Sequence, residues 1–446
     1  MEGTFLGGIH PFEGKDLSKD LPIKQVLPKG NLVYPVSQHI GAPAKPVVSK
    51  GDRVLVGQKI AEAGGFVSAD ICCSVSGTVK AVEPHMTVSG NIVSSIVVEN
   101  DGKYETVEGF GKERDYQTMT KEEIRGYIKD AGVVGMGGAG FPTHVKLTPK
   151  DDDAIDYVLV NGAECEPYLT SDYRVMLESP EEVVGGLQVI LKLFDKAKGY
   201  ICIEDNKPEA IAAMQKACEG QERIEVKALK TKYPQGAERT LIYAATGRKI
   251  YSAKLPSDAG CVVDNIDTVV AVYKAVCKST PLIRRIVTVT GDAISEPVNM
   301  EVKTGTIYSE LIAEAGGYKK DADGNEIQPE KVVSGGPMMG MALHTLDVPV
   351  MKTSSALLCM TKDEVAQYEP SPCIRCGRCV SACPSRLVPQ KMAVAAEHGD
   401  YEAFEAYGGM ECYECGSCTF VCPAKKQLTQ TFKEARRHVM DARRKK

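Results

Sequence analysis

CIRCGRCVSACP (Cys373–Pro384) and CYECGSCTFVCP (Cys412–Pro423) are two copies of one cysteine pattern in this 446-residue chain. Each copy has the spacing C-x2-C-x2-C-x3-C-P, which is typical of the ligands of [4Fe–4S] clusters. Thiolates that follow one another at two-residue gaps can wrap a loop around three corners of a cubane. The proline after the fourth cysteine then starts a new segment. The pattern predicts two clusters and therefore the transfer of single electrons.

In two-cluster ferredoxins the fourth cysteine of each run ligates the cluster that the other run holds. We therefore expect crossed ligand sets, one of Cys373, Cys376, Cys379 and Cys422, and one of Cys412, Cys415, Cys418 and Cys383. A pair of zinc sites is the alternative, but zinc ligands usually come as two C-x2-C pairs with a long gap between them. Helical patterns at 390–397 and 401–407 predict a helical ferredoxin domain over residues 360–446.

Length and composition predict several soluble domains. A chain of 446 residues with 43% hydrophobic and 25% charged residues is too long for one core, so we expect an α/β multidomain protein. The net charge of −5 argues against nucleic-acid binding. The first residues, Met1–Phe12, lack the features of a signal peptide, and no run is apolar enough to span a bilayer. We expect a cytoplasmic protein that is at most peripheral to a membrane.

Residues 30–100 read as short strands separated by turns, at Gly51-Asp52 and Ser76-Gly77 among others. The layout resembles the barrel-sandwich fold of lipoyl and biotinyl domains. No lysine lies between Lys59 and Lys80, so a lipoyl-type swinging arm is excluded there. We predict a scaffold domain over residues 1–115. For the neighbouring Cys72 and Cys73, a buried strand position is favoured over a redox pair.

A glycine-rich loop follows the scaffold. Thr120 and Glu123 form a capping box for a helix over 122–129, and GMGGAGFPTHVK (Gly135–Lys146) comes next. Its glycines match G-x-G-x-x-G, although Pro142 interrupts the helix that a Rossmann fingerprint requires. Consecutive glycines let backbone N–H groups approach a phosphate or a planar ring closely. A glycine-rich turn without a ligand is the alternative.

Residues 116–280 show alternating strands and helices. Strands are predicted at 157–160, 199–203 and 224–229, with helices at 180–196 and 208–218, which indicates a parallel, Rossmann-like sheet. Ligands bind such sheets at the carboxyl ends of the strands. Two loops lie there: NGAECEPY (161–168), with Glu164 and Glu166, and residues 234–239, with Gly236 and Glu238.

Residues 281–350 predict a smaller α+β unit, with a strand at 285–290, a helix at 306–315 and a glycine-rich motif from Gly335 to Gly340. The segment at 433–446 is basic and predicted to be helical. It suits an acidic partner or an anionic membrane surface, or it is simply solvated.

GMGGAGFPTHVK resembles the flavin-binding loop of the NADH-oxidising subunit of respiratory complex I, and NGAECEPY resembles the next flavin and NADH loop of that subunit. Together with GGIHP (Gly7–Pro11), SQHIGAPAKP (Ser37–Pro46) and the two cysteine runs, the chain resembles the C-subunit family of the Rnf complex, a membrane-bound, ion-pumping ferredoxin:NAD+ oxidoreductase. The resemblance spans Gly7 to Pro423. It departs from the complex I pattern at Met136, Ala163 and Ala237.

The resemblance implies noncovalent FMN, an NAD(H) site over it and two [4Fe–4S] clusters, and it makes the unit at 281–350 a soluble-ligand-binding β-grasp (SLBB) domain. It places the glycine loop along the FMN, Lys146 near the phosphate, Phe141 stacked on the dinucleotide, and Glu166 and Glu238 as catalytic residues beside the nicotinamide. The residues implied to bind cofactor are Gly135, Gly137, Gly138, Ala139, Gly140, Phe141, Lys146, Asn161, Glu164, Gly236 and Asn265.

The resemblance further implies that FMN exchanges a hydride with NAD(H) and single electrons with the clusters. The implied partners are the ferredoxin-like iron–sulfur subunit and the membrane subunits of the complex, at the cytoplasmic side of the membrane. A soluble cobalamin reductase of bacterial microcompartments shares the glycine loop and the cysteine runs and is the alternative. A carrier that has lost its flavin is disfavoured because Gly137, Gly138, Lys146 and Asn161 are all present.

Overall fold

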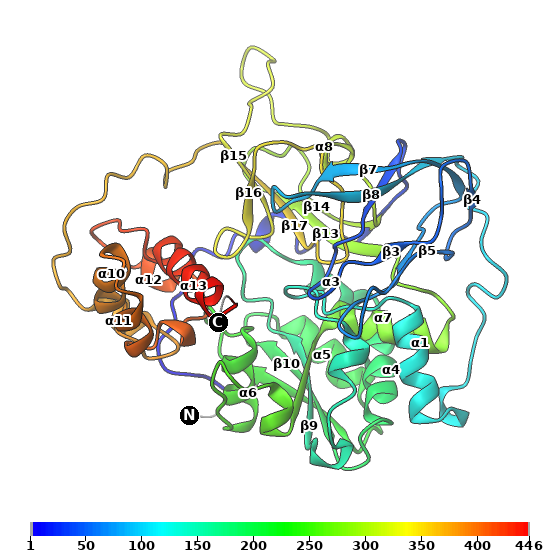
Figure 1. Ribbon diagram of the computed structural model, residues 1–446, viewed down its shortest axis with the longest axis horizontal. Helices are drawn as coiled ribbons and strands as arrows, with labels where there is room; N and C mark the ends of the chain where they lie inside the picture. The colour runs from blue at the N-terminus through cyan, green and yellow to red at the C-terminus, as the bar shows by residue number, and fades with distance from the viewer. Residues whose placement is uncertain (1–2, 445–446) are drawn as a thin grey trace.

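The computed structural model describes residues 3–444 and shows an α/β multidomain chain, as predicted. A β-rich domain, a β-grasp domain and a central α/β domain pack together, and a helical module lies to one side (Figure 1). Lys445 and Lys446 of the predicted basic segment lie outside the described residues. No helix within residues 3–444 is long and apolar enough to cross a membrane.

The N-terminal domain is a barrel sandwich built from two small sheets. One sheet has the order β2-β8-β7-β4 and the other β3-β5-β6. Alternate side chains such as Leu32, Ile60 and Ile96 are fully buried between the sheets, as expected where two strand faces pack. Cys72 and Cys73 are buried here, and burial raises the pKa of Cys72 to about 12. The strands are β2 (Leu32–Pro35), β3 (Lys45–Pro46), β4 (Arg53–Val54), β5 (Lys59–Glu62), β6 (Ile71–Cys72), β7 (Gly77–Met86) and β8 (Ile92–Asn100).

The central domain has a four-stranded parallel sheet in the order β11-β10-β9-β12. Its strands are β9 (Tyr157–Gly162), β10 (Lys198–Glu204), β11 (Ile224–Leu229) and β12 (Cys261–Asn265). The buried runs Val158–Val160 and Ile201–Ile203 are continuously apolar because helices cover the sheet. The helices are α1 (Lys121–Asp130), α2 (Thr143–Lys146), α3 (Ser171–Glu178), α4 (Pro180–Leu191), α5 (Pro208–Ala217), α6 (Glu238–Thr246) and α7 (Ile266–Cys277).

The β-grasp domain forms a six-stranded mixed sheet in the order β1-β14-β13-β17-β15-β16, packed on α8 (Tyr308–Glu314). One edge strand comes from the start of the chain: β1 (Lys24–Val26) pairs parallel with β14, with Val26 opposite Val302. Local sequence patterns did not show this long-range pairing. The other strands are β13 (Arg284–Thr290), β14 (Val298–Lys303), β15 (Lys331–Ser334), β16 (Met341–Leu343) and β17 (Ala356–Met360).

Three domains meet at Lys352, which lies between β16 and β17 of the β-grasp domain. Its buried ammonium donates to the carbonyl of Asp70 in the barrel sandwich and to that of Gly132 in the central domain. Gly132 has φ of 63°, and a Cβ there would stand 2.2 Å from the Asp70 carbonyl oxygen. The junction fixes the chain just before the glycine-rich loop. Burial lowers the pKa of Lys352 to about 8.

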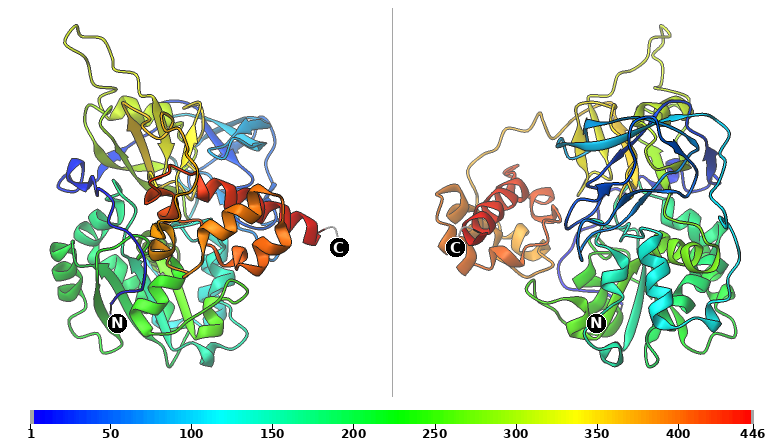
Figure 2. Two further views of the ribbon diagram at one scale, coloured as in Figure 1. Left: turned by 90° about the vertical axis from the view of Figure 1, so that its left-hand side faces the viewer. Right: turned by 45° about the vertical axis from the view of Figure 1, so that its right-hand side comes forward.

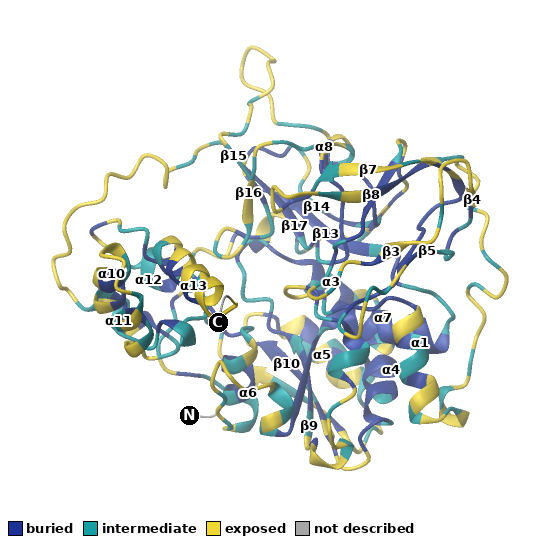
Figure 3. Cartoon of the chain, viewed as in Figure 1, coloured by how far each residue is buried: buried dark blue, intermediate teal, exposed yellow. Residues whose placement is uncertain are grey.

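A mostly exposed connection over residues 362–372 links the β-grasp domain to the helical module (Figure 3). It contains α9 (Arg378–Ala382), α10 (Pro389–Glu397), α11 (Tyr401–Ala406), α12 (Ser417–Phe420) and α13 (Leu428–Arg444) around Phe404 and Phe432. The first residues of the chain run between this module and the central domain (Figure 2). We call residues 3–18 the N-terminal arm.

Candidate flavin and iron–sulfur sites

The helical module contains two cavities, and each is lined by four of the pattern cysteines. One is lined by Cys373, Cys376, Cys379 and Cys422, and the other by Cys383, Cys412, Cys415 and Cys418. These are the crossed sets, in which each cavity takes its fourth cysteine from the other run. We call them the outer site and the inner site, respectively. Four convergent cysteines fit a [4Fe–4S] cluster in each cavity.

The two runs share one backbone plan. Arg375 and Glu414, which precede the second cysteines, both have a left-handed φ, of 55° and 57°. Gly377 and Gly416 follow those cysteines at 76° and 81°. A short helix, α9 or α12, then carries the third cysteine. This repetition explains how two unrelated stretches between the cysteines form equivalent loops.

The two sites differ in exposure. Cys373 and Cys376 of the outer site are exposed, whereas Cys383 and Cys415 of the inner site are buried. Within residues 3–444, no three His, Cys, Asp or Glu side chains lie close enough to share a single metal ion.

Val134 and Pro142 form an antiparallel β-bridge, and the glycine-rich loop lies between them. Gly135 N donates to Phe141 O at 2.9 Å, which closes the loop. A Cβ on Gly137 would lie 2.9 Å from Asn265 Cβ, whereas one on Gly138 would meet nothing within 4 Å. Gly137, Gly138 and Ala139 are exposed. The loop therefore offers an open stretch of backbone directly above the end of β12.

Gly140 and Phe141 end the open stretch. Gly140 has φ of 74°, and a Cβ there would stand 2.9 Å from Thr353 Cγ2 and 3.1 Å from Gln38 O. The SQHIGAPAKP segment of the barrel sandwich thus packs against the loop, since Ile40 N also donates to Gly140 O. Phe141 is half-buried. The scaffold domain positions the loop from outside.

Lys146 lies at the end of α2, and its ammonium donates to Val263 O at 2.7 Å and to Asp264 Oδ1 at 2.9 Å. Asp264 is buried at the end of β12, and its Oδ2 has no hydrogen-bond partner within residues 3–444. The expectation that Lys146 serves a phosphate did not include this ion pair. The pair keeps Lys146 at the carboxyl end of the sheet, and its role toward a phosphate stays a prediction.

The end of β9 and the loop that follows it both contact Gly236. Asn161 Nδ2 donates to Gly236 O at 2.8 Å, and Gly236 N donates to Cys165 Sγ at 3.2 Å. Asn161 and Gly236, both predicted as cofactor ligands, are thus brought together by the structure. Gly236 has no room for a large side chain, because a Cβ there would be 3.3 Å from Cys165 Sγ.

Glu164, Asp172 and Asn265 form a cluster of polar groups below the glycine loop. Asp172 N donates to Glu164 Oε1 at 2.7 Å, and Asn265 Nδ2 donates to Asp172 Oδ2 at 2.6 Å. Burial and the nearby Glu164 raise the pKa of Asp172 to about 8. Glu164 Oε2 is buried without a partner within residues 3–444, and Glu164 has φ of 47°. Unsatisfied carboxylate oxygens of this kind suit the hydroxyl and ring N–H donors of a flavin.

The two predicted catalytic glutamates have different surroundings. Glu166 Oε1 accepts from Met338 N at 2.7 Å and Met339 N at 3.1 Å in the β15–β16 loop. Burial raises its pKa, and these hydrogen bonds oppose the shift. Glu238 is not in a loop as predicted but is the first residue of α6, where it is exposed. The structure does not bring the two carboxylates into contact.

The inner site contacts the central domain directly. Tyr233 Oη donates to Cys415 O at 2.7 Å, and Cys415 packs with Cys165 and Met338. Arg239 pairs with Glu411 at 2.7 Å, one residue before Cys412. The same loop residues that surround the predicted flavin site therefore reach the inner site, while the outer site faces away.

Family models match the chain in four places: the RnfC barrel sandwich hybrid domain at 3–103, the Nuo51 FMN-binding domain at 128–274, the SLBB domain at 286–342 and the 4Fe-4S dicluster domain at 366–423. These matches define the class as a flavin and iron–sulfur electron-transfer protein and confirm the predicted fold. A solved NAD+-reducing [NiFe]-hydrogenase in the air-oxidised state shares the fold, with a TM-score of 0.50 and 20% identity over 66% of this chain and 55% of that chain.

Among curated proteins, the C-subunit of the proton-translocating ferredoxin:NAD(+) oxidoreductase complex of Clostridium ljungdahlii is 47% identical over 96% of this chain and 93% of its own length. The C-subunit of the Na(+)-translocating complex of Acetobacterium woodii is 44% identical over 99% and 98%. The C-subunit of the ion-translocating complex of Rhodobacter capsulatus is 40% identical over 96% and 82%. The chain belongs to the C-subunit family of these Rnf complexes.

Sequence reasoning missed the residues that support the predicted site from behind. Lys15 and Lys207 are buried beneath the 161–168 loop, and Asp264 anchors Lys146. Lys207 precedes the predicted helix at 208–218, and Lys15 lies in a short polar segment. Neither position carries a motif, so only the tertiary structure identifies them.

Proposed function

We propose that the chain is the NAD(H)-reactive member of a membrane-bound, ion-translocating ferredoxin:NAD+ oxidoreductase, with noncovalent FMN and two [4Fe–4S] clusters. The relatives named above carry this activity in their names. The observation that supports it best is the direct contact between the flavin-type loops and the inner cysteine site, through Tyr233 and Cys415.

When bound, FMN supplies the conversion between hydride transfer and single-electron transfer. The glycine loop, Asn161, Glu164 and Asn265 would hold it, and backbone groups of Gly137 and Gly138 would face it. Glu166, Glu238 and Phe141 would border NAD(H). At such a site, preorganised hydrogen-bond donors and buried acidic groups stabilise the charge that develops during the reaction.

The inner site would exchange electrons with the flavin, and the outer site with a partner. Cys373 and Cys376 are exposed there, beside the exposed Ile374. The partner would be the ferredoxin-like iron–sulfur subunit, with the membrane subunits anchoring the assembly at the cytoplasmic side. The microcompartment cobalamin reductase is not favoured, because residues 3–103 match the barrel sandwich of the Rnf family.

The decisive experiment measures cofactor content and reduction in purified, reconstituted protein. Acid precipitation should release FMN into the supernatant, and iron and sulfide should match two cubanes. Anaerobic NADH should bleach the flavin absorbance and then reduce the clusters. FAD in the supernatant, no flavin after reconstitution, or iron for one cluster only would contradict the proposal.

A further inference from the structure

The N-terminal arm touches both the predicted flavin loop and the inner site. Ile9 pairs with Tyr233 through two backbone hydrogen bonds of 2.9 Å, and Gly8 N donates to Ala382 O at 2.8 Å. Gly7 is pressed against the cysteine run, since a Cβ there would be 2.5 Å from Cys383 O. This arm, which contains no predicted site residue, is therefore built into the centre of the molecule.

Further along the arm, the chain is inserted beneath the 161–168 loop. Tyr168 N donates to Glu13 O at 2.7 Å. Gly14 has φ of 60°, and a Cβ there would lie 2.5 Å from the ring of Tyr168. Ser18 Oγ is 2.7 Å from Thr170 Oγ1, and both are buried. Because these contacts involve residues before and after Lys15 in the chain, they fix the position of Lys15.

The ammonium of Lys15 binds three backbone carbonyls, two in the 161–168 loop and one directly after it. Its Nζ donates to Glu164 O at 2.8 Å, Glu166 O at 3.1 Å and Leu169 O at 2.6 Å. Lys15 is 8% exposed, so water does not replace these bonds. An ammonium has three donors and no acceptor, and here all of its donors are used on one loop.

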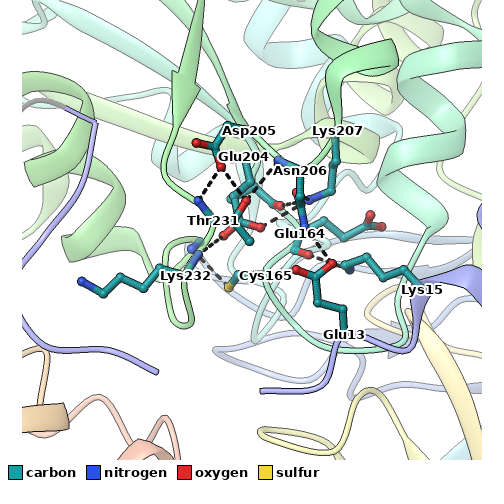
Figure 4. A network of polar contacts seen from close by, with 12 residues as sticks. Glu13, Lys15, Glu164, Cys165, Glu204, Asp205, Asn206, Lys207, Thr231 and Lys232 are labelled. Atoms are coloured by element: carbon teal, nitrogen blue, oxygen red, sulfur yellow. Dashed lines mark hydrogen bonds and ion pairs between the residues drawn. The ribbon is translucent and has the colours of Figure 1, made fainter. Parts of the chain in front are cut away.

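A second buried ammonium completes the arrangement (Figure 4). Lys207 Nζ donates to Ala163 O at 2.7 Å and lies 3.3 Å from Glu204 Oε2. Burial disfavours the charged form of Lys15 and lowers its pKa, while Glu164 and Glu204 oppose that shift. The charged groups that face one another are thus Lys15 from the arm, Lys207 before α5, Glu204 at the end of β10, and Glu164 on the loop.

The contacts with Lys15 restrict the conformation of the 161–168 loop. Because the carbonyls of Glu164 and Glu166 point inward to Lys15, the loop is held in one conformation, with Glu164 at its left-handed φ of 47°. A non-glycine residue holds that conformation only when its surroundings fix it. Without Lys15, the buried carbonyls would lack donors and the loop would rearrange.

We propose that Lys15 is a positioning residue for the flavin site, which holds the 161–168 loop from behind and places a buried positive charge in the wall of that site. The inference rests on the proposed function, since it takes that loop as part of the flavin site. Reduction of a flavin adds negative charge, so a buried cation nearby favours the reduced form.

The test compares Lys15→Met, Lys15→Gln and Lys15→Arg with Lys19→Met as the matched control. Lys19 lies directly after the arm, but its side chain is 40% exposed and pairs with Asp16. For each variant, the dissociation constant of FMN is measured by titrating flavin-free protein. The flavin midpoint potential is measured by anaerobic redox titration, and iron content and circular dichroism report folding.

In Lys15→Met we expect at least about a tenfold weaker affinity for FMN, the size of effect that one lost charged hydrogen-bonding group commonly has. The midpoint potential should become more negative in Lys15→Met and Lys15→Gln, whereas Lys15→Arg keeps the wild-type potential because it keeps the charge. Lys19→Met should match the wild type in both measurements.

The proposal is overturned if folded Lys15→Met, with normal iron content, binds FMN as Lys19→Met does and has the same potential. A lower melting temperature with unchanged affinity and potential overturns it too, because that result describes a purely structural lysine. If Lys15→Met does not fold, equal potentials in Lys15→Gln and Lys15→Arg overturn it. Absence of FMN binding by the wild type would instead remove the proposed function itself.

Discussion

Cys383 and Cys422 are the residues that join the two cysteine runs into one module. Each lines the cavity formed by the other run. Because a proline follows each of them, the backbone is held extended and cannot fold back onto its own run. Cys383 has φ of −68° and ψ of 118°, as this restriction requires.

We therefore expect Cys422→Ala to damage the cluster of Cys373, Cys376 and Cys379. A cubane with three thiolates readily loses an iron, so a [3Fe–4S] signal should appear in electron paramagnetic resonance. The spectrum should show the same cluster affected in Cys376→Ala and a different one in Cys415→Ala. Cys218→Ala, which removes a thiol outside both cavities, is the control. A Cys422→Ala spectrum that matches Cys415→Ala would show that the ligand sets are not crossed.

Asp172 predicts a pH dependence of stability. Burial and Glu164 raise its pKa from 3.8 to about 8, so between these values the folded protein holds a proton that the unfolded chain has released. The stability from this group is complete below the unfolded pKa and is lost as pH rises through about 8.

Asp172→Asn cannot titrate and should lose this dependence. The free energy of unfolding of the wild type, relative to the variant, should fall between about pH 5 and about pH 8, by at most about 1.4 kcal/mol per pH unit. Urea unfolding of both proteins at several pH values measures it. Parallel curves for the two proteins would show that Asp172 is ionised in the folded state.

At the scale of elements, the sequence predicted segments whose signals are local. The capping box of α1 is present, with Thr120 and Glu123 bonded to each other's backbone, and β11 has the predicted bounds. The helix predicted at 180–196 ends at Leu191, because the chain turns into 3-10-type contacts at Leu193 and Phe194. Alternating apolar runs and caps act within one turn or strand, so they can be recognised without a tertiary structure.

Elements that depend on distant partners were missed. The helix α3 follows the 161–168 loop without a side-chain cap. The strand β12 runs directly into α7 with no turn between them, and Asn265 both ends the strand and caps the helix. At the site, Asn161, Gly236 and Asn265 were predicted by resemblance, and the structure places Asn161 beside Gly236. It did not find Lys15, whose role depends on three carbonyls about 150 residues away.

The arm itself can be tested as an element. Gly14→Ala should push the arm away from Tyr168, because the Cβ has no room and φ is left-handed. We expect a loss of about 1–3 kcal/mol in the free energy of unfolding and weaker FMN binding. Gly126→Ala in α1 is the matched control. Its Cβ meets nothing within 4 Å, and alanine should stabilise that helix by about 1 kcal/mol. Equal stability of Gly14→Ala and wild type in urea would contradict the prediction.

At the scale of the whole molecule, polar contacts around Glu411 help to dock the helical module on the central domain. Arg239 pairs with Glu411 and stacks 4.2 Å from the centre of the Tyr413 ring, and Ser252 Oγ donates to Glu411 at 2.6 Å. All of these contacts lie beside the inner site. The connection at 362–372 is mostly exposed, so docking depends on these contacts together with those of Tyr233 to Cys415 and of Gly8 to Ala382.

We expect Arg239→Gln to loosen the docking without emptying the cofactor sites. Reduction of the clusters by NADH, followed by stopped-flow absorbance, should slow several-fold, because electron transfer weakens steeply with distance. Reduction of the flavin should keep its wild-type rate. Lys249→Gln, on the exposed part of the same domain, serves as control. Equal cluster reduction rates in the two variants would show that Arg239 does not fix the module.

Residues near the N-terminus bind residues that are synthesised much later, and this affects folding during translation. Ser18 accepts a hydrogen bond from Asn299, 281 residues further along, and Gly8 binds Ala382. At synthesis rates of about 5–20 residues per second, Ser18 waits roughly 15–55 s for Asn299 to be made, and Gly8 waits roughly 20–75 s for Ala382. During that time β1 has no β14 to pair with, while the barrel sandwich that follows it in the chain can already fold. The pairing of β1 with β14 is thus completed late in biosynthesis, and a ribosome that stalls before residue 299 releases a chain that lacks both this pairing and the bond from Asn299 to Ser18.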